Sequence, residues 1–93
     1  VFPNPATLRA LRYNSSYRVR FTSTGEYSRI AIYSISGQRI RNLSTKQSPS
    51  THADYWEWDG RNENGTMVEP GTYFFHALKH RKEGTIGKIL LKP

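Results

Sequence analysis

Hydrophobic and polar residues alternate along most of this 93-residue chain. A period of two is typical of β-strands that bury one face. In the segment 17–22, three apolar side chains alternate with Arg18, Arg20 and a threonine. In the segment 28–35, two isoleucines alternate with Arg29 and an alanine. Both segments are therefore predicted to be antiparallel strands with one solvated face.

A tight turn separates the second of these strands from the next. The sequence "SGQ" predicts this turn at Gly37, because glycine adopts the backbone conformation that reverses a hairpin. The turn is expected to let Ile35 and Ile40 both reach the core. Arg39 and Arg41 then flank Ile40 and are expected to face the other way.

Aromatic residues dominate the second half of the chain and continue the strand pattern. Trp56 and Trp58 fall on one face of a strand predicted over 54–59. Strand character resumes over 72–80, and a turn over 81–84 leads into a final strand. The two tryptophans are expected to supply much of the core.

Two segments lack this alternation. The segment 44–53 is polar and contains a proline, which predicts an exposed loop. The segment 1–11 contains Pro3 and Pro5, which the interior of a sheet does not tolerate, so it is expected to be an edge or lead-in segment. No stretch has a sustained helical period with caps. Six or seven short strands predict an all-β fold, an immunoglobulin-like antiparallel β-sandwich formed by one domain over 1–93.

Charge narrows the classes of partner. Fourteen Lys and Arg against seven Asp and Glu give a formal net charge of +7. Such a field favours nucleic acid, acidic glycans, lipopolysaccharide or an anionic membrane surface. The chain has no cysteine, so disulfides and thiolate metal sites are not available. It also lacks an apolar run long enough to span a membrane, and it begins at Val1, so we expect a module from a longer chain.

The acidic, glycine-rich stretch 58–75 is the first candidate for chemistry. A calcium loop of the EF-hand kind needs oxygen ligands at alternate positions before a fixed glycine. With Gly65 as that glycine, two asparagines fit, but Gly60 falls on the first ligand position and Arg61 would place a cation in the cage. The stretch is therefore interpreted as a turn rather than a metal site.

Catalysis finds little support in the other polar residues. The carboxylates fall mostly at predicted turns and strand ends, whereas a glycosidase needs two that converge in a cleft. His76 is expected to be a packed or surface residue rather than a base, and His52 and His80 are not at metal-ligand spacing. No nucleophile-elbow motif occurs. We expect no enzyme active site, no bound metal and no cofactor in these residues.

Basic side chains form two candidate partner surfaces. The strand arginines would share one sheet face, with Tyr17 and Tyr33 near enough to stack on bases. A solvated face explains the same arginines, so nucleic acid is the less favoured partner. Trp56 and Tyr55, with exposed arginines, are a further candidate platform for carbohydrate or nucleic acid. The surface residues are Arg18, Arg20, Arg29, Arg39 and Arg41 in one group and Lys79, Arg81 and Lys82, with Lys88 and Lys92, in the other.

Four ordered motifs resemble a known family. The chain opens with "VFPNP", continues with "RIAIYSISGQRIRNL" and "WDGRNENGTMVEPGTYFFHA", and closes with "GKILLKP". This set is similar to the FlgD-type immunoglobulin-like domain and to the related C-terminal sorting domains of the type IX secretion system. The residues that carry the resemblance are Pro3, Asn4, Pro5, Gly37, Trp58, Asp59, Gly60, Asn64, Gly65, Gly71, Tyr73 and Lys88.

The resemblance implies a role in recognition rather than catalysis. It suggests a C-terminal module of a secreted or cell-surface bacterial protein, exported across the outer membrane, that acts in type IX sorting, in surface anchoring or as an accessory to an upstream enzyme. Its partners would be the secretion apparatus or another protein, the upstream domain of the same chain, and an anionic surface glycan or lipopolysaccharide. A flagellar hook-capping domain and a carbohydrate- or nucleic-acid-binding module are the alternatives.

Overall fold

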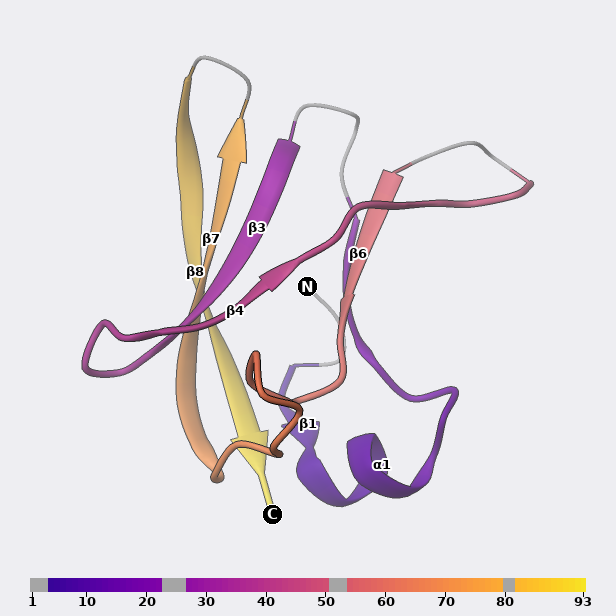
Figure 1. Ribbon diagram of the computed structural model, residues 1–93, viewed down its shortest axis with the longest axis vertical. Helices are drawn as coiled ribbons and strands as arrows, with labels where there is room; N and C mark the ends of the chain where they lie inside the picture. The colour runs from indigo at the N-terminus through magenta and orange to yellow at the C-terminus, as the bar shows by residue number, and fades with distance from the viewer. Residues whose placement is uncertain (1–3, 23–26, 51–53, 80–81) are drawn as a thin grey trace.

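The chain forms two β-sheets packed on each other, which confirms the predicted all-β sandwich (Figure 1). The computed structural model describes residues 4–22, 27–50, 54–79 and 82–93. One sheet has five strands in the order β1-β8-β7-β3-β4, and the other has three in the order β2-β6-β5. The elements are β1 (Ala6–Thr7), α1 (Leu8–Tyr13), β2 (Val19–Thr22), β3 (Tyr27–Ser34), β4 (Arg39–Leu43), β5 (Lys46–Gln47), β6 (Asp54–Trp58), β7 (Gly71–Lys79) and β8 (Lys82–Lys92).

Part of the second basic group lies outside the described residues. Arg81 is there, as are Pro3, His52 and His80. The side chains of Lys79 and Lys82 lie outside the described part as well, although both residues belong to strands. The structure therefore bears on the strand arginines and on Lys88 and Lys92, but not on the remainder of that group.

The core forms where the inward faces of the strands meet, as the alternation predicts. On the smaller sheet, Val19 pairs with Trp58 and Phe21 pairs with Trp56. All four side chains are buried, and both tryptophans are fully enclosed. Burial of a large aromatic side chain stabilises a fold by about 2–3 kcal/mol relative to leaving it exposed. These two pairs are therefore central to holding the sandwich together.

Phe75 of β7 joins the two sheets. Its ring contacts Phe21 edge to face across the interior, with centroids 5.0 Å apart. On its own sheet it lies over Gly87 of β8, where a Cβ atom would come within 2.4 Å of the ring. Gly87 is therefore required for the close approach of this aromatic ring rather than for a turn.

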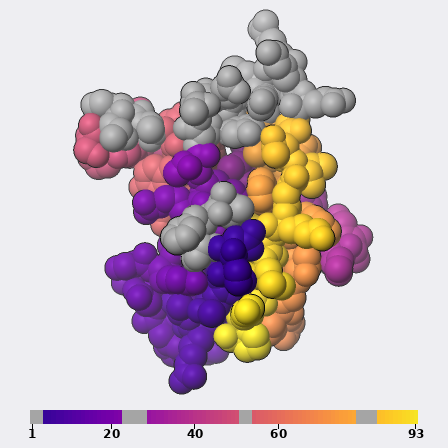
Figure 2. Space-filling model, turned by 180° about the vertical axis from the view of Figure 1, so that it is seen from behind, coloured from indigo at the N-terminus to yellow at the C-terminus, as the bar shows by residue number. Residues whose placement is uncertain are grey.

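The N-terminal segment covers one edge of the larger sheet, as expected for an edge or lead-in segment. β1 runs parallel to β8, with Ala6 opposite Leu91. The Asn4 side chain extends this pairing, since its Nδ2 donates to the carbonyl of Lys88 at 2.8 Å and its Oδ1 accepts from the amide of Leu90 at 3.0 Å. The side-chain amide thus replaces a peptide group in the ladder. In Figure 2 the first described residues lie against the final strand.

The helix α1 was not expected from the sequence. It has only six residues and no side-chain cap at its N-terminus. Leu8 and Leu11, three positions apart, turn toward the core and form its apolar side. Two leucines are too few to give a helical period, because tertiary packing and not propensity stabilises so short a helix. α1 closes the end of the sandwich near the C-terminus (Figure 1).

Three further expectations need correction. Ile35 does not reach the core: the turn spans Ser34 to Gln38, since the Gly37 amide donates to the Ser34 carbonyl, and the Ile35 side chain is 74% exposed. Ile40 does pack against the core. Arg41 is paired with the buried Ile32, and a register shift between β3 and β4 follows this pair. Arg41 therefore faces inward, and not outward as expected. The predicted loop 44–53 contains β5, which pairs with β6.

Candidate functional site

The glycine-rich loop uses its polar side chains to hold its own backbone. Asp59 Oδ1 accepts from the Arg61 amide at 3.0 Å and from Arg41 Nη1 at 3.1 Å. Asn62 Oδ1 accepts from the amides of Asn64 and Thr66 at 2.9 and 3.0 Å. These oxygens therefore accept from the loop's own amides and, at Asp59, from the Arg41 guanidinium. No group of three or more His, Asp or Glu side chains placed to hold a metal ion occurs among the described residues.

Two aromatic residues anchor the ends of this loop. Trp58 Nε1 donates to the Arg61 carbonyl at 3.0 Å, and the Tyr73 hydroxyl donates to the Glu69 carbonyl at 2.7 Å. The two rings pack edge to face with centroids 5.6 Å apart. Burial raises the pKa of Tyr73, and the negative charge of Glu69 adds to this effect. Each end of the loop is therefore attached to the core by a buried ring with a satisfied polar atom.

Gly60 explains the rest of the motif "WDG". Its φ of +79° lies in the left-handed region that favours glycine. A Cβ atom there would also lie 3.1 Å from Leu11 and 3.2 Å from Met67. The loop therefore passes closely beneath α1, and Gly60 leaves the space that the helix needs. The Val68 amide, which donates to the Gly60 carbonyl at 2.9 Å, holds the far side of the loop in place.

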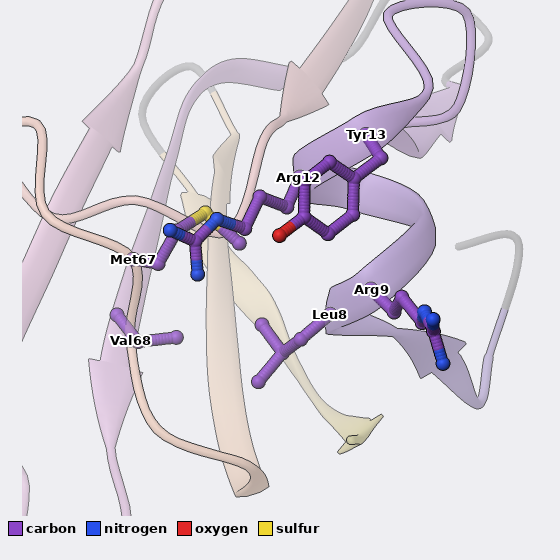
Figure 3. A pocket seen from close by; sticks show the side chains of 6 residues that line it. All are labelled: Leu8, Arg9, Arg12, Tyr13, Met67 and Val68. Atoms are coloured by element: carbon purple, nitrogen blue, oxygen red, sulfur yellow. The ribbon is translucent and has the colours of Figure 1, made fainter.

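A hollow of about 370 Å³ lies where α1 meets the loop (Figure 3). Its apolar floor is formed by Leu8 of the helix with Met67 and Val68 of the loop, all packed against the core. Two arginines and a tyrosine of α1 stand at its rim, and the Arg12 guanidinium lies 5.5 Å from the Tyr13 ring centroid. These rim groups are exposed, so an anion bound there would gain little from them. The floor is best explained as the packing seam of the helix. Its lining residues are Leu8, Arg9, Arg12, Tyr13, Met67 and Val68.

The strand arginines do not share one sheet face, contrary to the expectation. Arg20 lies on the smaller sheet, 3.5 Å from the Glu57 carboxylate and 4.9 Å from the Tyr55 ring centroid. Arg18 donates to three main-chain carbonyls in and after α1, the shortest bond being 2.7 Å to Tyr17. These two arginines brace local structure, so only those on the larger sheet remain as a partner surface.

Two of the arginines of the larger sheet are open to solvent. Arg29 of β3 and Arg39 of β4 are exposed. Arg41 is partly covered and pairs with Asp59, so it belongs to the loop rather than to a docking surface. The candidate platform of aromatic residues is also wrong, because Trp56 is fully buried and Tyr55 is partly covered.

The outer face of the larger sheet is the surface that the sequence did not reveal. Phe74 of β7 lies opposite Tyr33 of β3 on one side and Lys88 of β8 on the other. Its neighbours along the strand, Tyr73 and Phe75, both contact core residues, so Phe74 points outward. The signal was present in the three consecutive aromatic residues, since adjacent strand residues cannot all face one core.

Exposed aliphatic side chains surround this aromatic pair. Ile35 and Ile86 are 74% and 69% exposed, and Leu90 is 41% exposed. A hollow of about 320 Å³ lies between the turn at Gly37 and β8. Exposed apolar groups that cluster on one face are typical of docking surfaces. The hollow is lined by Tyr33, Ser34, Ile35, Gly37, Phe74, Phe75, His76 and Ile86.

Comparison of the chain with protein-family models, with curated proteins and with solved structures found no match. Among the described residues, no helix is long and apolar enough to cross a membrane.

Proposed function

We propose that this chain is a non-catalytic recognition module of an exported bacterial protein. The observation that carries the proposal is the outer face of the larger sheet, where the exposed Ile35 and Ile86 lie beside the partly exposed Tyr33 and Phe74 on strands that are otherwise well packed. An apolar face on a small domain has a free-energy cost in water unless a partner covers it. A binding role accounts for this face.

The state of the polar loop supports binding over catalysis. Asp59 and Asn62 are the residues most suggestive of chemistry, and each already accepts two hydrogen bonds from within the fold. Side chains used in this way stabilise the connection that the loop makes between β6 and β7. The loop then serves to position β7, which contributes Phe74 to the outer face.

The sorting role is the specific form of the proposal. The motifs resemble type IX sorting domains, and the hairpin of β7 with β8, which includes two of these motifs, presents the outer face. In this role the secretion apparatus recognises the module, and the parent protein reaches the cell surface. The net charge of +7 further suits an anionic surface glycan or lipopolysaccharide after export.

A reporter fusion tests this function. Residues 1–93, placed after a periplasm-targeted reporter in a host with a type IX system, are expected to carry the reporter to the cell surface, where added protease degrades it. The same reporter without the module should stay in the periplasm. Retention of the fused reporter in the periplasm, with the module folded, would contradict the sorting role.

A further inference from the structure

A single row of side chains crosses four strands of the larger sheet on its outer face. Lys88 of β8 is opposite Phe74 of β7, Phe74 is opposite Tyr33 of β3, and Tyr33 is opposite Arg39 of β4. Residues that are opposite each other in a ladder project from the same face. The row is therefore a cation, two aromatic rings and a second cation. We name these four residues the cross-strand row.

The neighbours of the cross-strand row make its centre apolar. On β8, Ile86 lies two positions before Lys88 and is opposite His76. Ile35 comes directly after β3, beside the hollow at Gly37. Ile35 and Ile86 are the two most exposed isoleucines of the described chain. Apolar side chains thus lie on either side of the aromatic pair, while both cations at the ends of the row are exposed.

Charge selects the kind of partner. The described side chains of this face include Arg29, Arg39 and Lys88, all exposed. Glu63 approaches the sheet edge, but its carboxylate accepts from the Asn42 amide at 2.7 Å. Two copies of this face would bring like charges together, which opposes self-association. A partner with carboxylates around an apolar group complements the face.

The spacing of the row fits an extended peptide laid across the strands. Three inter-strand steps of about 4.8 Å place the two cations about 14 Å apart. In an extended chain, residues i and i+4 are also about 14 Å apart, and residues i, i+2 and i+4 project to the same side. Acidic residues at i and i+4 would thus meet Lys88 and Arg39, while an apolar residue at i+2 meets Phe74 and Tyr33.

We infer that the cross-strand row binds an extended segment of a partner protein with the pattern acidic-x-apolar-x-acidic. This inference rests on the proposed function, since it specifies how the module recognises a protein. Binding at the row uses side chains and leaves the edges of the sheet unused, which distinguishes it from recognition by strand addition. The ion pairs at its ends are solvent-exposed, so affinity is modest and falls as salt rises.

An NMR titration of the ¹⁵N-labelled chain tests the inference. The probe is a blocked peptide, Thr-Glu-Thr-Phe-Thr-Glu-Thr, and the control is Thr-Glu-Glu-Thr-Phe-Thr-Thr, which has the same composition and a different spacing. We expect the probe to bind at least about fivefold more tightly, a difference of about 1 kcal/mol. Its shifts should gather at the cross-strand row and at Ile86, and grow smaller in high salt.

Matched variants separate the row from general charge. Arg39→Glu with Lys88→Glu should weaken binding of the probe at least about tenfold, and Phe74→Thr should do the same without a change of charge. Arg12→Glu with Lys46→Glu makes an equal change of charge on α1 and β5 and should leave the affinity within about twofold. Amide dispersion in the free spectra checks that each variant is folded.

Several results would overturn the inference. Equal affinity for the two peptides, absence of binding at millimolar probe, or an equal loss in the α1 and β5 variant would each reject the row as a specific site. Tighter binding of an oligonucleotide or of anionic vesicles to the same face would assign it to another partner. None of these outcomes depends on export, so failure here beside a displayed reporter rejects the acidic-x-apolar-x-acidic pattern at the cross-strand row and leaves the sorting role in place.

Discussion

The glycine-rich loop and the outer face of the larger sheet differ in whether their side chains make hydrogen bonds or packing contacts inside the fold. In the loop, Asp59 and Asn62 have donors from within the chain, and Trp58 is fully buried. On the outer face, the side chains of Phe74 and Ile86 line a hollow open to solvent instead of packing in the core. Residues that suggest chemistry in the sequence therefore hold the loop together, and strand residues without such a signal lie on the solvent side of the larger sheet.

The largest effect is expected where adjacent aromatic residues face opposite sides of β7. Phe75→Ala should lower the free energy of unfolding by about 3 kcal/mol, because it removes a ring that packs on Phe21 and over Gly87. Phe74→Ala should cost only about 1 kcal/mol, since its ring leaves no interior cavity. Urea denaturation followed by tryptophan fluorescence measures both changes. Similar costs at the two positions would mean that the outer face is part of the core.

The two turn glycines provide a second, somewhat smaller contrast. Gly60 and Gly65 have nearly the same positive φ, +79° and +82°, but only Gly60 has side chains within reach of an added Cβ atom. Gly65→Ala should cost about 1 kcal/mol from backbone conformation alone. Gly60→Ala should cost about 2–3 kcal/mol, because Leu11 and Met67 must also move.

Thermal and urea unfolding of the two glycine variants give the comparison directly. A larger loss at Gly60 confirms that the loop supports α1, and a helix loosened by Gly60→Ala should also expose Leu11 to faster hydrogen exchange. Equal losses at the two glycines would show that the close contact beneath α1 contributes nothing to stability.

The smallest effect concerns the buried anchor of the loop, Tyr73. Its pKa in the folded chain is raised above the ordinary 10.0 by burial and by Glu69. The unfolded chain therefore loses the tyrosine proton first as pH rises, and stability falls above about pH 10 while it is unaffected by this group below that pH. Tyr73→Phe should flatten this fall relative to the parent. Urea midpoints between pH 8 and 11 measure it, and an unchanged slope would refute the linkage.

The strand faces were predictable because alternation reports which side chains share a face. It placed Val19, Phe21 and the two tryptophans correctly, while the glycine of "SGQ" placed the turn at Gly37. Ile35 was misplaced because alternation does not indicate where a strand ends, and the turn already includes that residue.

Other features could not be predicted from the local pattern of apolar and polar residues. α1 has two leucines and no capping side chain, so its helical conformation depends on the loop against which it packs. Arg41 faces inward because of a register shift between β3 and β4, which arises from pairing rather than from sequence alternation. Alternation also gives no information on whether the second face of a sheet is covered, so the cross-strand row became visible only once the strand order was known.

Export of two variant fusions tests the central claim, that the outer face and not the loop is the recognised surface. One fusion carries Phe74→Thr with Ile86→Thr, and the other carries Glu63→Gln with Asn64→Ser in the loop; circular dichroism confirms that both modules fold. We predict that the outer-face variant leaves the reporter in the periplasm and that the loop variant still displays it on the cell surface. Display of the outer-face variant with retention of the loop variant would contradict this account.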